Sequence, residues 1–242
     1  MKRIFKEVFS EIFEFDSITA ECGIQIAERR VDLIIKNLRK LKIYVEKESW
    51  LRYVYDNRNS WIIIEFKGPY ETISFDVILT TIYYKLLLAI SEKIWFHAIS
   101  AFVIGPRLAK NVRQILAEKT HNYLRILGNK AFYEIINDKT LEIHVITYDE
   151  LDPNIPGNES LCMFSSKEKI CSVAIKRILE TYDSRSILYS FALFYKPDIV
   201  RIKMKEPIPK ENIAKAVEVI GLDRLAEALG PKEVGPCFEK GS

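Results

Sequence analysis

Residues 61–67, with the sequence Trp-Ile-Ile-Ile-Glu-Phe-Lys, constrain the fold of this chain more than any other segment. β-Branched and aromatic residues favour a pleated, buried strand, and the Gly68-Pro69 pair that follows is typical of a strand end. Side chains two positions apart share one face of a strand, so Glu65 and Lys67 point to the same side. Burying a charge without a partner is costly, and the segment therefore predicts a core strand that ends in a functional or ion-paired site.

Asp32 raises the same question, because it lies within the apolar segment Val-Asp-Leu-Ile-Ile at residues 31–35. If the two strands are neighbours, Asp32 and Glu65 converge on one point. Carboxylate oxygens with no imidazole or thiolate close by in sequence suit Mg²⁺ or Mn²⁺. We therefore expect a divalent cation here, with the Lys67 ammonium beside it to orient a water or neutralise charge.

The remaining pattern predicts an α/β protein, because segments with helical periodicity alternate with short β-rich segments. Predicted helices cover residues 3–13, 72–92 and 108–123, and further helices cover 166–181, 184–195 and 209–220. Predicted strands cover residues 24–26, 31–35, 41–45, 50–55 and 61–67, followed by 98–104, 133–136 and 141–147. The last two flank the turn-forming Asn137-Asp138-Lys139, which indicates a hairpin. Residues 152–158 are rich in Pro, Gly and Asn, so we expect a core at 1–151 and a mainly helical accessory region at 152–242.

Composition excludes several classes of protein. The chain has 242 residues, of which 48% are hydrophobic and 29% charged, and this suits one large domain with a buried core. Its longest apolar stretch, residues 73–90, contains Asp76 and Lys85 and falls short of a membrane span. The N-terminus lacks the features of a signal peptide, and the four dispersed cysteines form no CxxC pair, so we expect a cytoplasmic protein without a zinc ribbon or disulfide framework.

Asp32, followed 33 residues later by Glu65-Phe66-Lys67, resembles the D…ExK signature of the PD-(D/E)XK nuclease superfamily. The segments around residues 28–33, 64–69, 128–136 and 141–151 resemble the recombination-promoting, transposase-like nucleases of that superfamily. The resemblance implies a restriction-endonuclease-like α/β/α sandwich with a mixed central sheet. It also implies that Asp32 and Glu65 bind the metal, that the Phe66 carbonyl adds a ligand, and that Lys67 assists the attacking water.

Two positions leave the site open to alternatives. Asp56, nine residues before Glu65, competes with Asp32, but its polar Asp-Asn-Arg-Asn-Ser setting is typical of a turn, so we favour Asp32. An acid on the first helix often completes such sites, and Glu11 is the central candidate for a further metal ligand, although a solvated helix face is the favoured explanation for each acid there. Residue 31 is valine where the superfamily name has proline.

The net charge of +3 is too small to indicate a nucleic-acid partner by itself. Basic residues do gather on the predicted helix at 108–123 and just before it, where Arg107, Lys110 and Arg113 are candidates for phosphate contacts. We expect a Mg²⁺-dependent DNA endonuclease that leaves 5′-phosphate ends, with homodimerisation through the helical region as one option. The rival expectation is an inactive nuclease-fold module that binds nucleic acid or a protein.

Overall fold

The computed structural model describes residues 2–23, 30–112, 114, 124–126, 131–135, 142–183 and 186–195. In these ranges the helices are α1 (Lys2–Ile12), α2 (Trp50–Asp56), α3 (Phe75–Glu92), the 3-10 turn η1 (Phe96–Ala98), α5 (Glu159–Cys162), α6 (Glu168–Thr181) and α7 (Ile187–Tyr195). The strands are β1 (Phe13–Gly23), β2 (Arg30–Leu41), β3 (Trp61–Phe66), β4 (Ile99–Gly105), β5 (Leu124–Ile126), β6 (Phe132–Ile135) and β7 (Ile143–Thr147).

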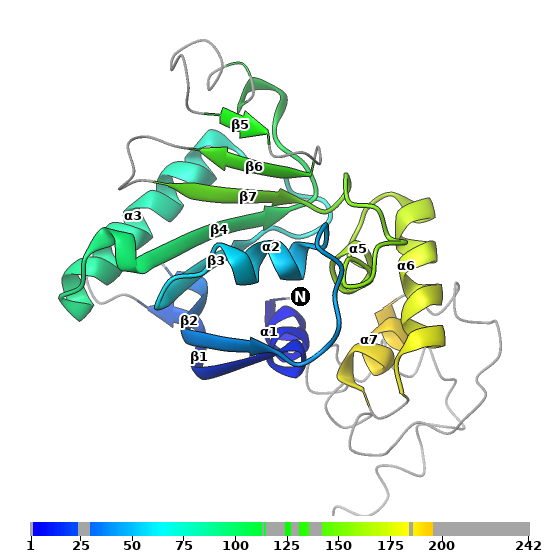
Figure 1. The fold of residues 1–242 in the computed structure, drawn as a ribbon. Helices are drawn as coiled ribbons and strands as arrows, with labels where there is room; N and C mark the ends of the chain where they lie inside the picture. The colour runs from blue at the N-terminus through cyan, green and yellow to red at the C-terminus, as the bar shows by residue number, and fades with distance from the viewer. Residues whose placement is uncertain are drawn as a thin grey trace, which may run out of the picture.

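The strands form one mixed sheet in the order β1-β2-β3-β4-β7-β6-β5 (Figure 1). β1, β2 and β3 are antiparallel neighbours, whereas β3, β4 and β7 run parallel, and β5, β6 and β7 are again antiparallel. The parallel pair β3 and β4 requires a crossover, which α3 supplies between them in sequence. The expected α/β class with a mixed sheet is therefore confirmed.

Helices cover both faces of this sheet and bury two hydrophobic cores (Figure 1). On one face α1, α2 and the helices α5–α7 pack over β3 through residues such as Ile62, Ile64 and Phe66. On the other face α3 packs over Ile63 and Ala101. This three-layer arrangement is compatible with an α/β/α sandwich.

Residues 50–55 are helical, so the expected strand there is wrong. Ser49 caps α2, because its hydroxyl oxygen accepts a hydrogen bond from Arg52 N at 3.1 Å. Trp50, Leu51 and Val54 are buried at a helical spacing, and the Arg52 guanidinium pairs with Asp56 one turn later at 2.9 Å. The aromatic and β-branched composition suggests a strand, but the Ser49 cap and the helical spacing of the buried residues favour a helix.

Of the other expected elements, some are confirmed, some are displaced, and some lie outside the described residues. The helix at 3–13 and the strands at 31–35, 61–67 and 98–104 are confirmed with small shifts, as are the helices at 72–92, 166–181 and 184–195. Residues 42–45 contain no strand, because β2 ends at Leu41, and β1 was not expected at all. β6 and β7 pair as a hairpin, whose turn at 136–141 lies outside the described residues, as do 24–26, most of 108–123 and all of 209–220.

The helices beyond residue 158 belong to the same hydrophobic core as α1 and β3. Phe164 is fully buried, with its ring 5.6 Å from that of Phe66 in an edge-on contact. Trp50 donates its backbone N–H to Asn158 Oδ1 at 2.9 Å and its indole N–H to Ser160 Oγ at 3.0 Å. In the described part of the chain, residues 152–158 thus do not separate two cores. No described helix is long and apolar enough to cross a bilayer.

Candidate functional site

The ends of β2 and β3 bring Asp32 and Glu65 to one face of the sheet. The pairing of these strands ends with Leu33 opposite Ile64, so Asp32 and Glu65 are the next residue on each strand beyond this last pair. Because side chains alternate along a strand and Ile34 and Ile63 face α3, Asp32 and Glu65 face α3 as well. Both residues are buried, with exposed fractions of 5% and 7%.

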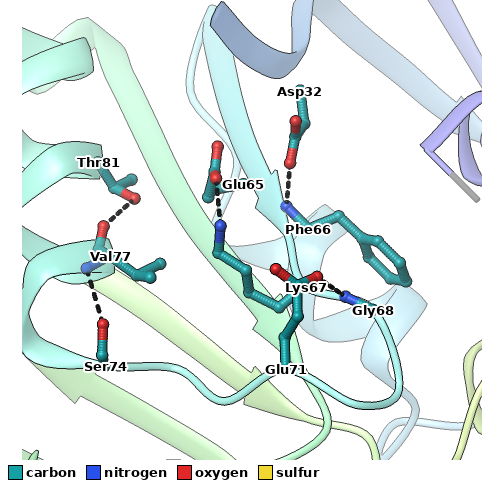
Figure 2. Close-up of polar contacts among 9 residues, drawn as sticks. All are labelled: Asp32, Glu65, Phe66, Lys67, Gly68, Glu71, Ser74, Val77 and Thr81. Carbon is teal, nitrogen blue, oxygen red and sulfur yellow. Dashed lines mark hydrogen bonds and ion pairs between the residues drawn. The ribbon is translucent and has the colours of Figure 1, made fainter. Parts of the chain in front are cut away.

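Asp32 also provides a hydrogen-bond acceptor for the backbone at the end of β3. Its Oδ2 accepts a hydrogen bond from Phe66 N at 2.9 Å, and the carboxylate thus takes the place of a backbone acceptor on β2 (Figure 2). The fully buried Phe66 ring points to the opposite face, where it stacks on Phe5 with centroids 4.6 Å apart. The alternation of Glu65, Phe66 and Lys67 expected from the sequence is therefore present.

Lys67 lies directly beside Glu65. Its Nζ is 2.8 Å from Glu65 Oε1, and both side chains are largely buried (Figure 2). Two carboxylates therefore lie at this end of β3, one bonded to Phe66 N and the other paired with the Lys67 ammonium. Carboxylate oxygens are the ligands that hard divalent cations prefer.

Three residues that the sequence did not indicate support this segment. Tyr148 directly follows β7. Its hydroxyl donates to the Lys67 carbonyl oxygen at 3.0 Å, and the Tyr148 ring stacks with the Phe66 ring. Burial is the main cause that raises the pKa of Tyr148, so the phenol remains protonated and can donate this bond. Glu71 accepts from Gly68 N at 2.6 Å and fixes the turn after Lys67. Gly105 at the end of β4 is the third residue.

Gly105 leaves no room for a side chain. A Cβ atom there would lie 2.8 Å from Ile73 Cγ1 and 3.1 Å from Lys67 Cβ. In the sequence Gly105-Pro106 marked only a strand end, because nothing in the sequence places Lys67 against β4. The pairing of Phe66 with Ile104 creates this close approach.

We expect Gly105→Ala to displace Lys67 and to destabilise the fold by roughly 1–3 kcal/mol, as overpacking does in a closely packed core. Urea unfolding measures the destabilisation. Gly157→Ala, a glycine with φ of +99° remote from β3, is the comparison, because its strain should lower stability without moving Lys67. If Gly105→Ala matches the wild type in stability, the close approach described here is incorrect.

The structure places the two alternative acids elsewhere. Asp56 lies at the end of α2, half exposed, and pairs with Arg52. Glu11 Oε2 accepts from Leu188 N in the first turn of α7 at 3.0 Å, on the face of the sheet opposite α3. This contact gives Glu11 a capping role, and we do not retain it as a metal ligand.

Of the basic candidates, Arg107 and Lys110 are exposed and Arg113 lies outside the described residues. Arg107 follows β4 at the same sheet edge as Lys67, and its carbonyl oxygen accepts from Ile73 N at 2.9 Å. The backbone of this segment is therefore fixed close to the candidate site, while the Arg107 side chain is free to reach solvent.

Comparisons with protein-family models, with curated proteins and with solved structures found no match for this chain. Any functional assignment accordingly depends on the residues and their geometry.

Proposed function

We propose that the chain is a Mg²⁺-dependent endodeoxyribonuclease of the PD-(D/E)XK type, with Asp32, Glu65 and Lys67 as its catalytic residues. The observation that supports the proposal is that Asp32 of β2 bonds to Phe66 N, the residue between Glu65 and its ion-pair partner Lys67. Asp32, Glu65 and Lys67 are the residues whose D…ExK spacing resembles the superfamily signature. The antiparallel β1-β2-β3 segment, followed by α3 and the parallel β4, is also consistent with the implied sandwich.

The residues fit a hard divalent cation. Asp32 and Glu65 supply carboxylate oxygens, and Asp32 can accept from Phe66 N and still offer lone pairs, because each carboxylate oxygen accepts more than once. In an extended strand the N–H and C=O of one residue point to the same side, so the Phe66 carbonyl also faces Asp32 and is available as a ligand. When bound, Mg²⁺ or Mn²⁺ supplies Lewis acidity toward a phosphodiester oxygen and lowers the pKa of a water.

Lys67 would hold the attacking water by donating a hydrogen bond to it, and would offset negative charge as the phosphorane forms. The water oxygen would form a new bond to phosphorus and lose a proton to solvent, while the bond to the 3′-oxygen breaks and this oxygen takes a proton from solvent. The products are a 5′-phosphate and a 3′-hydroxyl. Tyr148 and Gly105 act as positioning residues, because they hold the backbone and the stem of Lys67.

The direct test is incubation of the purified full chain with supercoiled plasmid and millimolar Mg²⁺ or Mn²⁺. We expect nicked or linear DNA whose 5′ ends are ligated without prior phosphorylation, and no cleavage in excess EDTA. If the protein retains DNA in a metal-independent manner and never cuts it, the rival function, an inactive nuclease-fold module, replaces this proposal.

Arg107 and Lys110 are candidates for phosphate contacts beside the site. Each lost phosphate contact removes roughly one unit from the slope of log affinity against log salt concentration. We expect the Arg107→Gln, Lys110→Gln double variant to bind a DNA duplex more weakly and with a slope smaller by up to about 2. Lys176→Gln on α6, where Lys176 is similarly exposed, provides the control.

A slope that stays unchanged in the double variant would make these two residues ordinary solvated side chains. Arg113, the third basic candidate, is suited to the same measurement. The cytoplasmic location and the homodimer both stay predictions.

A further inference from the structure

A second cluster of potential metal ligands lies where β6 meets β7. Glu134 on β6 is directly opposite His144 on β7, and Glu142 comes two residues before His144, which places all three side chains on one side of the hairpin. Their ligand atoms, one carboxylate oxygen each from the glutamates and one ring nitrogen of His144, all lie within 4.8 Å of one another.

The His144 ring is held rigidly. The residue is 4% exposed, and its ring stacks on Phe102 with centroids 4.9 Å apart. Tyr53 of α2 lies edge-on to it, and the Tyr53 hydroxyl is 2.9 Å from His144 Nδ1. The Tyr53 ring is itself stacked on Phe132. Packing and one hydrogen bond therefore determine where Nε2 points.

The other ring nitrogen, Nε2, faces the carboxylates. Its distance to Glu142 Oε1 is 3.8 Å, which is too long for a hydrogen bond. The contact between Nε2 and Glu142 is therefore not a hydrogen bond, although a carboxylate oxygen of each glutamate lies close to the imidazole ring.

A cation explains the arrangement better. Metal-ligating histidines regularly donate their second ring N–H to an acceptor, and the Tyr53 hydroxyl oxygen can accept from Nδ1 in this way. Zn²⁺ binds imidazole nitrogen and carboxylate oxygen at ~2.0–2.2 Å, so only a small contraction of the cluster would enclose the ion. Imidazole also favours a first-row transition metal over Mg²⁺.

Lys85, a buried lysine of α3, donates to the Glu142 carbonyl oxygen at 3.3 Å and so holds the backbone of Glu142 in place. Glu134 and Glu142 supply carboxylate oxygens, which bind a divalent cation together with an imidazole nitrogen.

We propose that Glu134, Glu142 and His144 form a binding site for a divalent transition-metal ion of the Zn²⁺ class, which clamps β6 to the start of β7. This site is separate from Asp32 and Glu65, because His144 faces the α2 side of the sheet with Phe102, whereas the two acids face α3. It is independent of the nuclease proposal.

The test uses the full chain, freed of metal and then titrated with Zn²⁺ in a calorimeter in the presence of millimolar Mg²⁺, which occupies the hard-oxygen sites. The wild type is expected to bind one Zn²⁺ at low micromolar concentration or tighter. Glu142→Gln and His144→Asn are each expected to weaken that binding at least about tenfold. Asp32→Asn and Glu168→Gln, an exposed glutamate of α6, should leave it unchanged.

Co²⁺ gives a second readout without reference to activity. An imidazole-containing site of low coordination number should produce visible absorption in the wild type, and this absorption should be lost in Glu142→Gln. Glu142 is partly exposed, so this variant should fold even if His144→Asn does not. Equal Zn²⁺ affinity in the wild type and Glu142→Gln, or no Zn²⁺ binding by the wild type, overturns the proposal.

Discussion

Replacing Asp32 by asparagine is expected to reduce DNA cleavage by on the order of a hundredfold or more, the loss typical when a preorganised charged or polar group is removed from an active site. The asparagine side-chain oxygen can still accept the hydrogen bond from Phe66 N, so the end of β2 should remain paired with β3. The substitution removes the negative charge of the side chain and keeps its size and shape. Initial rates of plasmid cleavage at saturating Mg²⁺ measure the effect, with circular dichroism as the check of folding.

Two further variants make this result specific. Lys67→Ala should cause a loss of similar size without abolishing Mn²⁺ binding, because the lysine contacts Glu65 and is not itself a ligand. Asp56→Asn should cleave DNA like the wild type, since Asp56 lies on α2 and pairs with Arg52. Full activity in Asp32→Asn, or a severe loss in Asp56→Asn, would show that the metal-binding aspartate has been misassigned.

A chain that ends at Leu151 is expected not to fold. It lacks the segment from α5 through α7, whose side chains fill the core beneath α1 and β3, among them Phe164, Ile175 and Phe191. It also loses the acceptors of both Trp50 N–H groups, Asn158 and Ser160, which would leave buried donors unsatisfied. Far-ultraviolet circular dichroism and a thermal scan of the truncated chain measure the outcome.

The full chain allows a finer version of the same experiment. Phe164→Ala should lower the free energy of unfolding by about 3–5 kcal/mol, because it leaves a cavity against Phe66 and Tyr195. Lys176→Ala on the exposed side of α6 should change it by less than about 0.5 kcal/mol. Cooperative unfolding of the chain that ends at Leu151 would restore the expected separation between a core and an accessory region.

Local sequence patterns predicted the elements in which apolar residues recur at a regular spacing or form a continuous run. Residues 61–66 and 99–105 are strands that are buried almost throughout, and their continuous apolar composition was sufficient to identify them. α2 was missed because seven residues with three aromatics have strand-like composition, whereas the deciding contacts, from Trp50 to Asn158 and Ser160, come from more than a hundred positions away. Propensity is a weak guide where such tertiary contacts exist.

The candidate site shows the same division. Asp32, Glu65 and Lys67 stood out because charges in apolar strands are unusual, and the structure brings them together. Tyr148 and Gly105 could not be predicted, since their roles depend on β4 lying beside β3 and on β7 lying beside β4. The contact between Glu11 and α7 could not be predicted either, because helical spacing alone does not show which neighbour a partly exposed acid will meet.

The Asp32 carboxylate accepts a hydrogen bond from Phe66 N at the end of β3, and it is also a proposed metal ligand. Because folding already restricts the rotamers of Asp32, binding a ligand there loses little additional side-chain entropy. The same hydrogen bond would therefore couple ligand binding at Asp32 to the pairing of β2 with β3. A ligand that drew Asp32 away from β3 would leave a buried amide without its acceptor and would loosen the end of β2. The rate of amide hydrogen exchange at Phe66 therefore shows whether the Asp32 carboxylate keeps this hydrogen bond.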